Sequence, residues 1–415
     1  MRFEAHSYFA GKESIKSVCK RFGTPLYLYG ADKIIEQINT FKEAFNWQKL
    51  KVKYAMKSLS NINILKLMKA NGVDIDAVSL YEAKTGLLAG YRPNQIMYTP
   101  SGVKFEEIAL GVKKGFQLNI DNLSSLKKFG EAYGSSVPCC IRINPHVKAG
   151  GNYKIQTGHK DSKFGISLLQ IDEILALTQQ YNIHVNGLHL HSGSEIDEID
   201  AYLKGARVLF KLAKKFDAID FIDFGSGFKI PYKAGDKETD LRKLGEHLVA
   251  EFEVFCREYG RELEMWFEPG KFLVSEAGVL LVNTSVVKKT PYSTFIGVDS
   301  GLNHLIRPMM YNAYHEIVNV SNPQGPKEHY NIVGYICETD TFAANRAINQ
   351  VREGDILAIK NAGAYGFSMS SNYNSRPRPA EALIINGEVK LIRKRENFDD
   401  LLRNQVDIFE EVLNV

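Results

Sequence analysis

Short apolar runs alternate with stretches of helical spacing through the first two thirds of the chain. Eight runs have the length and the β-branched or aromatic content of strands; they are residues 52–56, 74–78, 96–99, 117–120, 138–143, 185–190, 219–224 and 264–268. Between them apolar residues recur three and four positions apart, which predicts amphipathic helices. This alternation predicts a (β/α)8 TIM-like barrel, a fold that takes about 250 residues. An open doubly wound sheet fits the alternation too, but eight strands favour closure.

The pattern changes after about residue 275, where strand-like runs follow one another with few helices between them. These runs are residues 279–287, 294–299, 317–320, 330–337, 355–360 and 380–389. They predict a C-terminal β-rich domain of sandwich-like or barrel-like form. We therefore expect a barrel over residues 31–275 and a β-rich domain formed by residues 1–30 and 276–415. The last piece, residues 398–415, is expected to be helical.

Composition narrows the class of protein. Hydrophobic residues make up 44% of the chain and charged residues 24%, which is ordinary for a soluble enzyme. A net charge of +4 on 415 residues argues against a dedicated nucleic-acid binder. The five cysteines have no metal-ligand spacing, the first residues lack the apolar core of a signal peptide, and no run is long enough to span a membrane. We expect a cytoplasmic protein with no resident metal and no nucleic-acid or membrane partner.

Polar residues collect where the expected barrel strands end, which is the edge where barrels of this kind place their sites. Lys57 ends the first strand, and the others in chain order are Asp76, Arg142, His189 with His191, the turn Gly225-Ser226-Gly227, and Glu268. Each has an ordinary explanation on its own. Lys57 is either a solvated lysine or a Schiff-base lysine.

The other three features have competing interpretations as well. The turn at residues 225–227 is either a tight strand-to-helix connection or a phosphate cradle. His189 and His191 share a strand face, so they are packed core residues, a metal-binding pair, or include a ring that stacks on a flat cofactor. Glu268 is a loop acid or the partner of a pyridine nitrogen. Together with Lys57 they fit pyridoxal 5′-phosphate bound as an imine.

With these residues assembled, the chain resembles the fold-type III pyridoxal-phosphate-dependent decarboxylases. Within them it is similar to the branch that removes CO2 from meso-2,6-diaminopimelate to give L-lysine, the last step of lysine biosynthesis. The resemblance spans nearly the whole chain in family order. It is carried by YAMKSLSN (54–61), SKFGI (162–166), HLHSGSEI (189–196), DFGSGF (223–228), EPGKF (268–272), LIRPMMYNAYH (305–315), ICETD (336–340) and NAGAYGFSMSSNYNSRPRPAE (361–381).

The resemblance implies a carbon–carbon lyase and gives each matching residue a role. Lys57 and Cys337 would be catalytic, the first as the lysine that carries the cofactor. The cofactor contacts would come from Lys57, Asp76, Arg142, His191, Ser194, Gly227, Glu268, Gly270, Lys271 and Tyr365. The substrate contacts would come from Lys271, Arg307, Tyr311, Glu338 and Tyr365. The family also implies a homodimer with shared active sites, in which Cys337 and Glu338 serve the neighbouring subunit.

Three departures from the family pattern concern fine geometry. Lys271 replaces the usual arginine and so lacks its bidentate fork. The segment Cys337–Asp340 is one residue shorter than the commoner form, and Ser226 replaces the middle glycine of the phosphate turn.

Four rivals remain for the function. Ornithine/lysine and carboxynorspermidine decarboxylases act on substrates without a distal carboxylate, so Arg307 discriminates against them. A racemase is disfavoured by Glu268, because racemases of this fold place a cation at the ring nitrogen. A non-catalytic cofactor carrier would need only the barrel, and a metal-dependent hydrolase would use His189 and His191.

Overall fold

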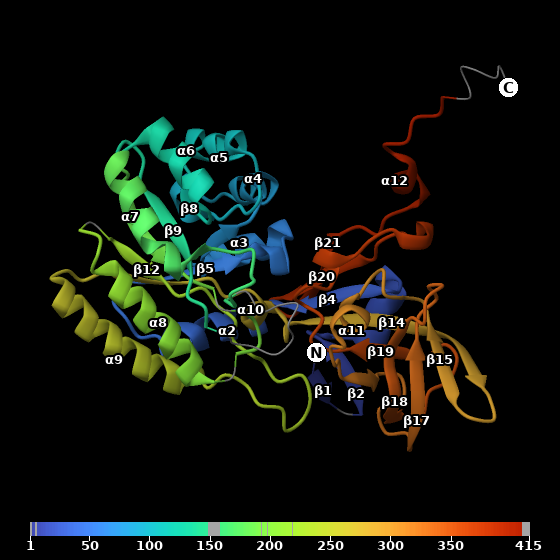
Figure 1. Cartoon of the computed structure of the whole chain (residues 1–415). Helices are drawn as coiled ribbons and strands as arrows, with labels where there is room; N and C mark the ends of the chain where they lie inside the picture. Colours follow the sequence, from blue (N-terminus) through green and yellow to red (C-terminus); the bar gives the residue numbers. More distant parts are fainter. Residues whose placement is uncertain are drawn as a thin grey trace. The chain divides into compact units, whose positions relative to one another are not determined.

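The computed structural model describes residues 2–4, 6–147, 158–191, 193–196, 198–217 and 219–408. It divides the chain into two compact units, which are residues 33–275 and residues 1–32 with 276–415. Figure 1 labels the elements of both. In the described part of the chain, no helix has both the length and the hydropathy needed to cross a bilayer.

The first unit is a closed barrel of eight parallel strands, as the sequence predicts. Each strand pairs in parallel with the next, and the circle closes where β13 pairs with β5. The strands are β5 (Leu50–Ala55), β6 (Asp74–Ala77), β7 (Ile96–Tyr98), β8 (Gln117–Ile120), β9 (Cys139–Asn144), β11 (Val185–His189), β12 (Phe221–Asp223) and β13 (Glu264–Phe267). A short β10 (Ile166–Ser167) extends the sheet beside the end of β9.

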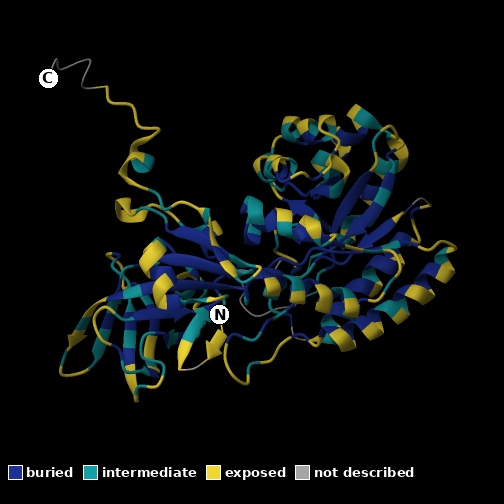
Figure 2. Cartoon of the chain, turned by 180° about the vertical axis from the view of Figure 1, so that it is seen from behind, coloured by how far each residue is buried: buried dark blue, intermediate teal, exposed yellow. Residues whose placement is uncertain are grey.

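Helices connect these strands and cover the outside of the barrel (Figure 1). They are α2 (Ala31–Ala44), α3 (Ile62–Ala70), α4 (Leu80–Leu88), α5 (Phe105–Lys113), α6 (Leu123–Tyr133), α7 (Ile171–Gln180), α8 (Ile199–Ala213), α9 (Leu241–Tyr259) and α10 (Lys271–Val274). Figure 2 shows the strands buried and the outer faces of the helices exposed.

Several polar residues that follow the strands begin these helices. The side chains of Asn61, Ser79 and Asn122 accept the backbone N–H two or three residues on, which caps α3, α4 and α6. Ser79, which the sequence places beside Asp76 at the second strand end, therefore starts a helix. Polarity at a strand end has two sources, helix capping and the site, and only some of these side chains belong to the site.

Apolar side chains from four strands fill the centre of the barrel. Met97, Cys140, Phe221 and Trp266 form one buried cluster, in which the Phe221 and Trp266 rings stack with centroids 3.5 Å apart. A side chain at Gly187 would come within 2.2 Å of the Phe221 ring, so only glycine leaves room for this stack. The barrel is therefore a packed core, open to chemistry only at its ends.

Lys53 is buried in the same interior. Its Nζ donates to Gln117 Oε1 at 2.7 Å, lies 3.8 Å from Asp74 Oδ2 and sits 4.1 Å from the Trp266 ring centroid. Gln117 and Asp74 are the first residues of β8 and β6. Lys53 thus belongs to the end of the barrel away from Lys57.

The second unit is a mixed β-sheet that the first thirty residues join. The strand order is β18-β17-β15-β14-β4-β20-β21, and β19 pairs with β14 and β16. Strand β4 (Leu26–Gly30) lies between β14 and β20, which explains why the N-terminal segment belongs to this unit. The others are β14 (Gly278–Lys289), β15 (Thr294–Val298), β16 (Ile317–Asn319), β17 (Lys327–Val333), β18 (Thr341–Asn349), β19 (Ile356–Ile359), β20 (Ala380–Ile385) and β21 (Glu388–Arg393).

Smaller elements complete this unit. A three-stranded sheet, β1 (Arg2–Glu4), β2 (Ser7–Ala10) and β3 (Glu13–Ser14), leads into α1 (Ile15–Phe22). Ile15 and Val18 of α1 pack with Leu26, Leu28 and Leu281 in one core cluster. The short helix α11 (Arg307–Tyr311) follows β15.

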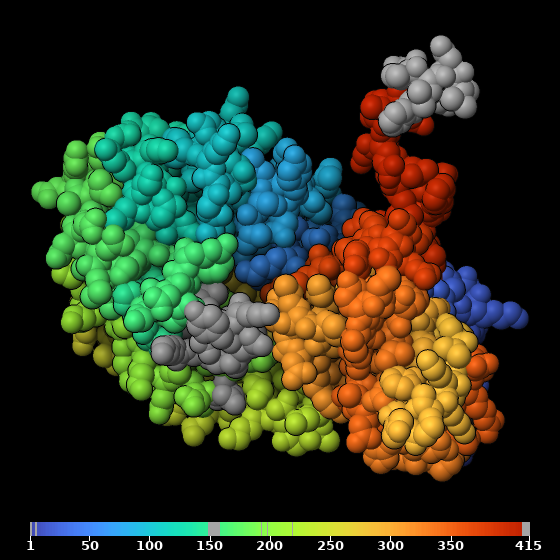
Figure 3. Space-filling view, turned by 45° about the vertical axis from the view of Figure 1, so that its right-hand side comes forward, coloured from blue at the N-terminus to red at the C-terminus, as the bar shows by residue number. Residues whose placement is uncertain are grey.

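The structure corrects several sequence expectations for this unit. β17 begins at Lys327, before the expected run 330–337, and ends at Val333, inside that run. β18 was not expected, because its alternation is interrupted by exposed Ala344, Asn345 and Ala347. The run 380–389 is a hairpin whose turn, Asn386-Gly387, has φ of 54° and 77°, as a tight Asn-Gly turn requires. The expected terminal helix is only α12 (Phe398–Leu402); residues 403–408 are not helical, and residues 409–415 lie outside the described ones. Residues 394–408 run away from the sheet of their own unit (Figure 3).

Candidate active site

Lys57 lies in a one-turn 3-10 helix, Met56–Ser58, directly after β5, so it is not the last residue of the strand as the sequence suggested. Hydrogen bonds brace this turn. Ser58 Oγ donates to the Ala55 carbonyl at 2.8 Å, and the Leu59 N–H donates to the Met56 carbonyl at 3.1 Å. The Ala55 N–H donates to the Pro269 carbonyl, which joins the start of the turn to the Glu268 loop.

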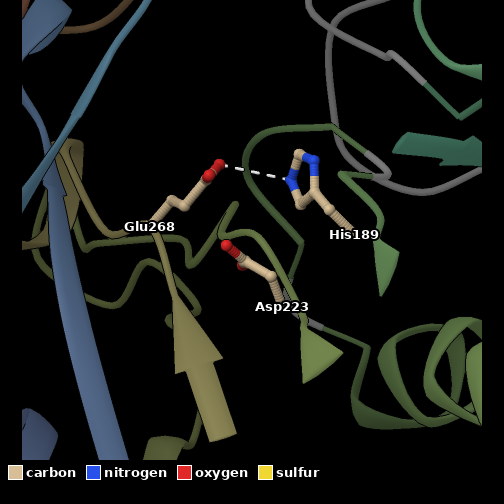
Figure 4. Close-up of side chains that lie close together, drawn as sticks. All are labelled: His189, Asp223 and Glu268. Atoms are coloured by element: carbon tan, nitrogen blue, oxygen red, sulfur yellow. Dashed lines mark ion pairs between the residues drawn. The ribbon is translucent and has the colours of Figure 1, made fainter. Parts of the chain in front are cut away.

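Three chemically active side chains converge at the carboxyl end of the barrel (Figure 4). His189 ends β11, Asp223 ends β12 and Glu268 follows β13, and all three are buried. His189 Nε2 lies 3.2 Å from Glu268 Oε2, and His189 Nδ1 lies 2.7 Å from Asn119 Nδ2 on β8. The neighbouring Asp223 Oδ1 accepts the Gly225 N–H at 2.8 Å.

The buried carboxyl groups of the site do not carry equal charge. Burial, reinforced by the charge of Glu268, raises the pKa of Asp76 to about 7, and the same two causes raise the pKa of Asp223 well above its ordinary value. Burial also acts to raise the pKa of Glu268, but His189, Lys57 and His191 outweigh it, and the net pKa is lowered. Glu268 is therefore the carboxylate that keeps its negative charge, as closely spaced acids in a low dielectric require.

Arg142 brings a positive charge to the same end of the barrel from β9. Its side chain is buried, and its guanidinium carbon lies 4.8 Å from the Phe164 ring centroid. Burial lowers the pKa of the guanidinium, whereas Glu268 and other acids oppose the shift. Arg142 remains a cation and offsets part of the acidic charge around it.

The glycine turn after β12 is held against the loop after β11. The Ser226 N–H donates to His191 Nδ1 at 3.2 Å, which orients this ring, and burial lowers the His191 pKa well below its ordinary value. Gly225 and Gly227 have φ of 61° and 116°, and a Cβ on either would lie 2.3 Å from a carbonyl oxygen of that loop. Glycine is required here for the close approach of two loops.

Lys271 joins this loop to the start of α10. Its buried Nζ donates to Ser194 Oγ at 2.8 Å and lies 3.1 Å from Glu195 Oε1. At Gly270 a Cβ would lie 3.1 Å from Ser58 Oγ of the Lys57 turn. The structure thus gathers the sequence-predicted residues of this unit at one edge of the barrel, although their contacts with a cofactor remain predictions.

The other predicted site residues belong to the second unit. Arg307 is buried at the start of α11 and Tyr311 ends that helix. Cys337 and Glu338 are exposed on the segment between β17 and β18, and Tyr365 has a φ of 56°. Their roles also remain predictions.

Two members of the buried cluster were not assigned a role from the sequence. Asp223 was noted only as part of the seventh strand, and Asn119 was not singled out. The sequence did offer a signal for Asn119, because it stands between apolar residues in the run Gln117–Ile120. Burying an amide without a hydrogen-bond partner costs free energy, so an amide at such a position indicates a partner. The partner of that amide, His189, is seventy positions away, so spacing could not reveal it.

The buried residues His189, Asp223 and Glu268 can be compared with both a metal site and a pyridoxal-phosphate site. Ligand atoms of His189, Asp223 and Glu268 lie within 4.8 Å of one another, so this set, rather than His189 with His191, is the one that could surround a metal ion. The same cluster also fits pyridoxal phosphate. Glu268 Oε1 is buried and has no hydrogen-bond partner among the described residues, and an ionised carboxylate suits a protonated ring nitrogen.

Comparison with known proteins gives a consistent result. Residues 31–275 match the family model described as "Pyridoxal-dependent decarboxylase, pyridoxal binding domain". The chain is 35% identical to the diaminopimelate decarboxylase of Methanothermobacter thermautotrophicus over 412 residues, with 97% of this chain and 96% of the relative covered. It is 36% identical to that of Aquifex aeolicus over 406 residues, with 95% and 94% covered.

Solved structures extend the likeness to both units. The diaminopimelate decarboxylase of M. jannaschii in complex with L-lysine has a TM-score of 0.90 at 29% identity, with 98% of each chain covered. The enzyme of Helicobacter pylori complexed with L-lysine has a TM-score of 0.85 at 29% identity, with 96% of this chain and 100% of the other covered. A lysine/ornithine decarboxylase from Vibrio vulnificus, at 20% identity and a TM-score of 0.78, shares the fold.

Proposed function

Because the chain belongs to the pyridoxal-dependent decarboxylases, we propose that it removes CO2 from meso-2,6-diaminopimelate and releases L-lysine, with pyridoxal 5′-phosphate as its cofactor. The observation that carries the proposal is Glu268. It is a buried, ionised carboxylate, one oxygen of which has no hydrogen-bond partner among the residues that the structure describes, and it lies at the barrel edge that also holds Lys57. The similarity to diaminopimelate decarboxylases over nearly the full chain selects the substrate.

The cofactor, when bound, supplies an electron sink for the carbon–carbon bond that breaks. Glu268 keeps the ring nitrogen protonated, which strengthens that sink. Lys57 would hold the cofactor through its amine, and the neutral ring of His191 would lie against the cofactor ring. The phosphate would be held by Ser194, Gly227, Gly270 and Lys271, and the remaining cofactor contacts would come from Asp76, Arg142 and Tyr365.

We assign substrate recognition to residues whose charges complement the far end of diaminopimelate, which carries an ammonium and a carboxylate. Arg307 binds the carboxylate and Glu338 binds the ammonium. Tyr311, Tyr365 and Lys271 complete the substrate contacts. Cys337 or Lys57 returns a proton to the carbon that loses CO2.

A CO2-release assay across diaminopimelate, ornithine, lysine and carboxynorspermidine tests the function. Release from diaminopimelate well above the other three is expected. Preference for ornithine or lysine would overturn the substrate assignment. The purified protein should also absorb near ~420 nm, and Lys57→Ala should remove this band while the exposed Lys51→Ala keeps it. A colourless protein that copurifies with zinc would favour the hydrolase instead.

The shared homodimeric site is part of the same proposal and has its own test. If Cys337 returns the proton, Lys57→Ala and Cys337→Ala should each be inactive alone. If Cys337 serves the neighbouring subunit, a re-equilibrated equal mixture forms hybrid dimers with one native site, and about a quarter of all sites recover activity. No recovery, although the subunits exchange, would place Lys57 and Cys337 of each site on one chain.

A further inference from the structure

An amide, an imidazole and a carboxylate from three barrel strands form a buried line. Asn119 Nδ2 lies 2.7 Å from His189 Nδ1, and His189 Nε2 lies 3.2 Å from Glu268 Oε2. Asn119 and His189 are 0% and 1% exposed, and Glu268 is 6% exposed, so water does not compete for these contacts. The family resemblance gives His189 no role.

The proton positions in this line follow from its two ends. An ionised carboxylate only accepts hydrogen bonds, so its charge favours the tautomer with the hydrogen on Nε2, which lies 3.2 Å from Oε2 although the two groups are not aligned as a hydrogen bond. Burial lowers the pKa of His189, and the charges of Arg142 and Lys57 lower it further, although Glu268 opposes them. A neutral ring with its hydrogen on Nε2 has a lone pair on Nδ1, and the Asn119 amide donates to it.

The two carboxylate oxygens of Glu268 have different surroundings. Oε2 faces His189, whereas Oε1 is buried and has no hydrogen-bond partner in the described part of the chain. The nearby Asp223 accepts the Gly225 N–H through Oδ1, and its Oδ2, like Glu268 Oε1, has no hydrogen-bond partner among the described residues. The carboxylate of Glu268 thus has one oxygen beside His189 and one without a hydrogen-bond partner within the described ranges.

We propose that His189, set in its tautomer by Asn119, is a positioning residue that holds Glu268 Oε2 and directs Oε1 to the ring nitrogen of the cofactor. The inference rests on the proposed function, because it needs a cofactor with a basic ring nitrogen. His189 acts only through Glu268. Its removal therefore weakens the bond between Glu268 and the cofactor rather than removing a separate cofactor contact.

Two substitutions of His189 separate its two nitrogens. His189→Asn keeps an amide near Nδ1 but lacks a group that reaches Glu268, whereas His189→Gln places an amide donor near Nε2. We expect His189→Asn to raise the dissociation constant for pyridoxal 5′-phosphate about 10- to 100-fold, by analogy with the loss of other residues that orient a ligand-binding side chain. We expect His189→Gln to raise it less than fivefold. The exposed His247→Asn is the matched control.

A double-mutant cycle with Glu268→Gln decides whether His189 acts through Glu268. In the Glu268→Gln background, His189→Asn should change the dissociation constant less than twofold. Full additivity, or wild-type affinity in His189→Asn, would overturn the proposal. Thermal unfolding of each apo-protein shows whether a variant has a folding defect. If His189→Asn does not fold, the test passes to His189→Gln. An affinity loss in His189→Gln equal to that of Glu268→Gln would then contradict the proposal. These affinities remain measurable if the protein binds the cofactor but releases no CO2 from diaminopimelate, a result that would refute only the proposed function.

Discussion

Asn374 donates a hydrogen bond from Nδ2 to the Sγ of Cys337 at 3.2 Å. The preceding residue, Tyr373, donates from its hydroxyl to Glu338 Oε1 at 2.5 Å. Two adjacent side chains of the segment that follows β19 therefore hold Cys337, a candidate for returning the proton, and Glu338, to which we assign recognition of the distal ammonium. This pairing restricts the conformations of both groups before substrate arrives.

The Tyr373 contact predicts a defect in substrate binding. Tyr373→Phe removes the hydroxyl that holds Glu338, so the KM for diaminopimelate should rise about threefold to tenfold, while kcat changes little. Steady-state kinetics measure both constants. Tyr292→Phe, which removes the hydroxyl of a tyrosine that is 96% exposed, is the control. A KM equal to that of the control would show that Glu338 needs no such support.

Arg307 predicts selectivity for a substrate with a distal carboxylate. Arg307→Gln removes the charge and the bidentate fork, and the KM for diaminopimelate should rise by about two orders of magnitude. Met309→Ala, an exposed change on the same short helix, should leave KM unchanged. Since Arg307 is buried, thermal unfolding must accompany the kinetics. An unaltered KM in a folded Arg307→Gln protein would sink the substrate assignment.

Asp76 predicts a pH dependence of the apo-protein's stability. Its pKa is about 7 in the folded protein, against about 3.9 in an unfolded chain. Between these values the folded state holds a proton that the unfolded state lacks, so this group's contribution to the free energy of unfolding falls as pH rises from about 4 to 7. The slope is at most about 1.4 kcal/mol per pH unit.

Asp76→Asn should remove this contribution. The stability of the variant relative to the wild-type apo-protein should therefore improve as pH rises towards 7 and level off above it. Denaturant unfolding at several pH values measures the difference, with the exposed Asp172→Asn as the control. A pH-independent difference would mean that Asp76 is ionised throughout this range.

Lys53 predicts a loss of stability at the other end of the barrel. Lys53→Ala removes the bond to Gln117 and the contact with the Trp266 ring, and it leaves a cavity, so the free energy of unfolding should fall by about 3 kcal/mol. Lys51→Ala, exposed on the same strand, should cost less than about 0.5 kcal/mol. Chemical denaturation compares them. Equal stability of the two variants would mean that the buried Lys53 amine makes no net contribution to the free energy of unfolding, as is known for some buried charges.

Local pattern was enough to predict the barrel. The eight strands appear where apolar runs predict them, because strand period, apolar runs and capping residues act over a few neighbouring positions. The same locality explains the errors in the second unit. The alternation of apolar and polar residues is broken in β18. The run 380–389 contains a turn, and its Asn386-Gly387 pair is the only local sign of it.

The sequence by itself determined which polar residues stand at the strand ends, and so Lys57, His189 and Glu268 could be named in advance. It could not decide which of them touch. Lys53 and Lys57 share one alternation, yet Lys53 is buried against Gln117 and Trp266, and Lys57 lies in a turn at the opposite end of the strand. The contacts from Asn119 to His189 and from His189 to Glu268 join residues seventy or more positions apart. Only closure of the sheet, which sets the distances between its strands, brings them into one buried line.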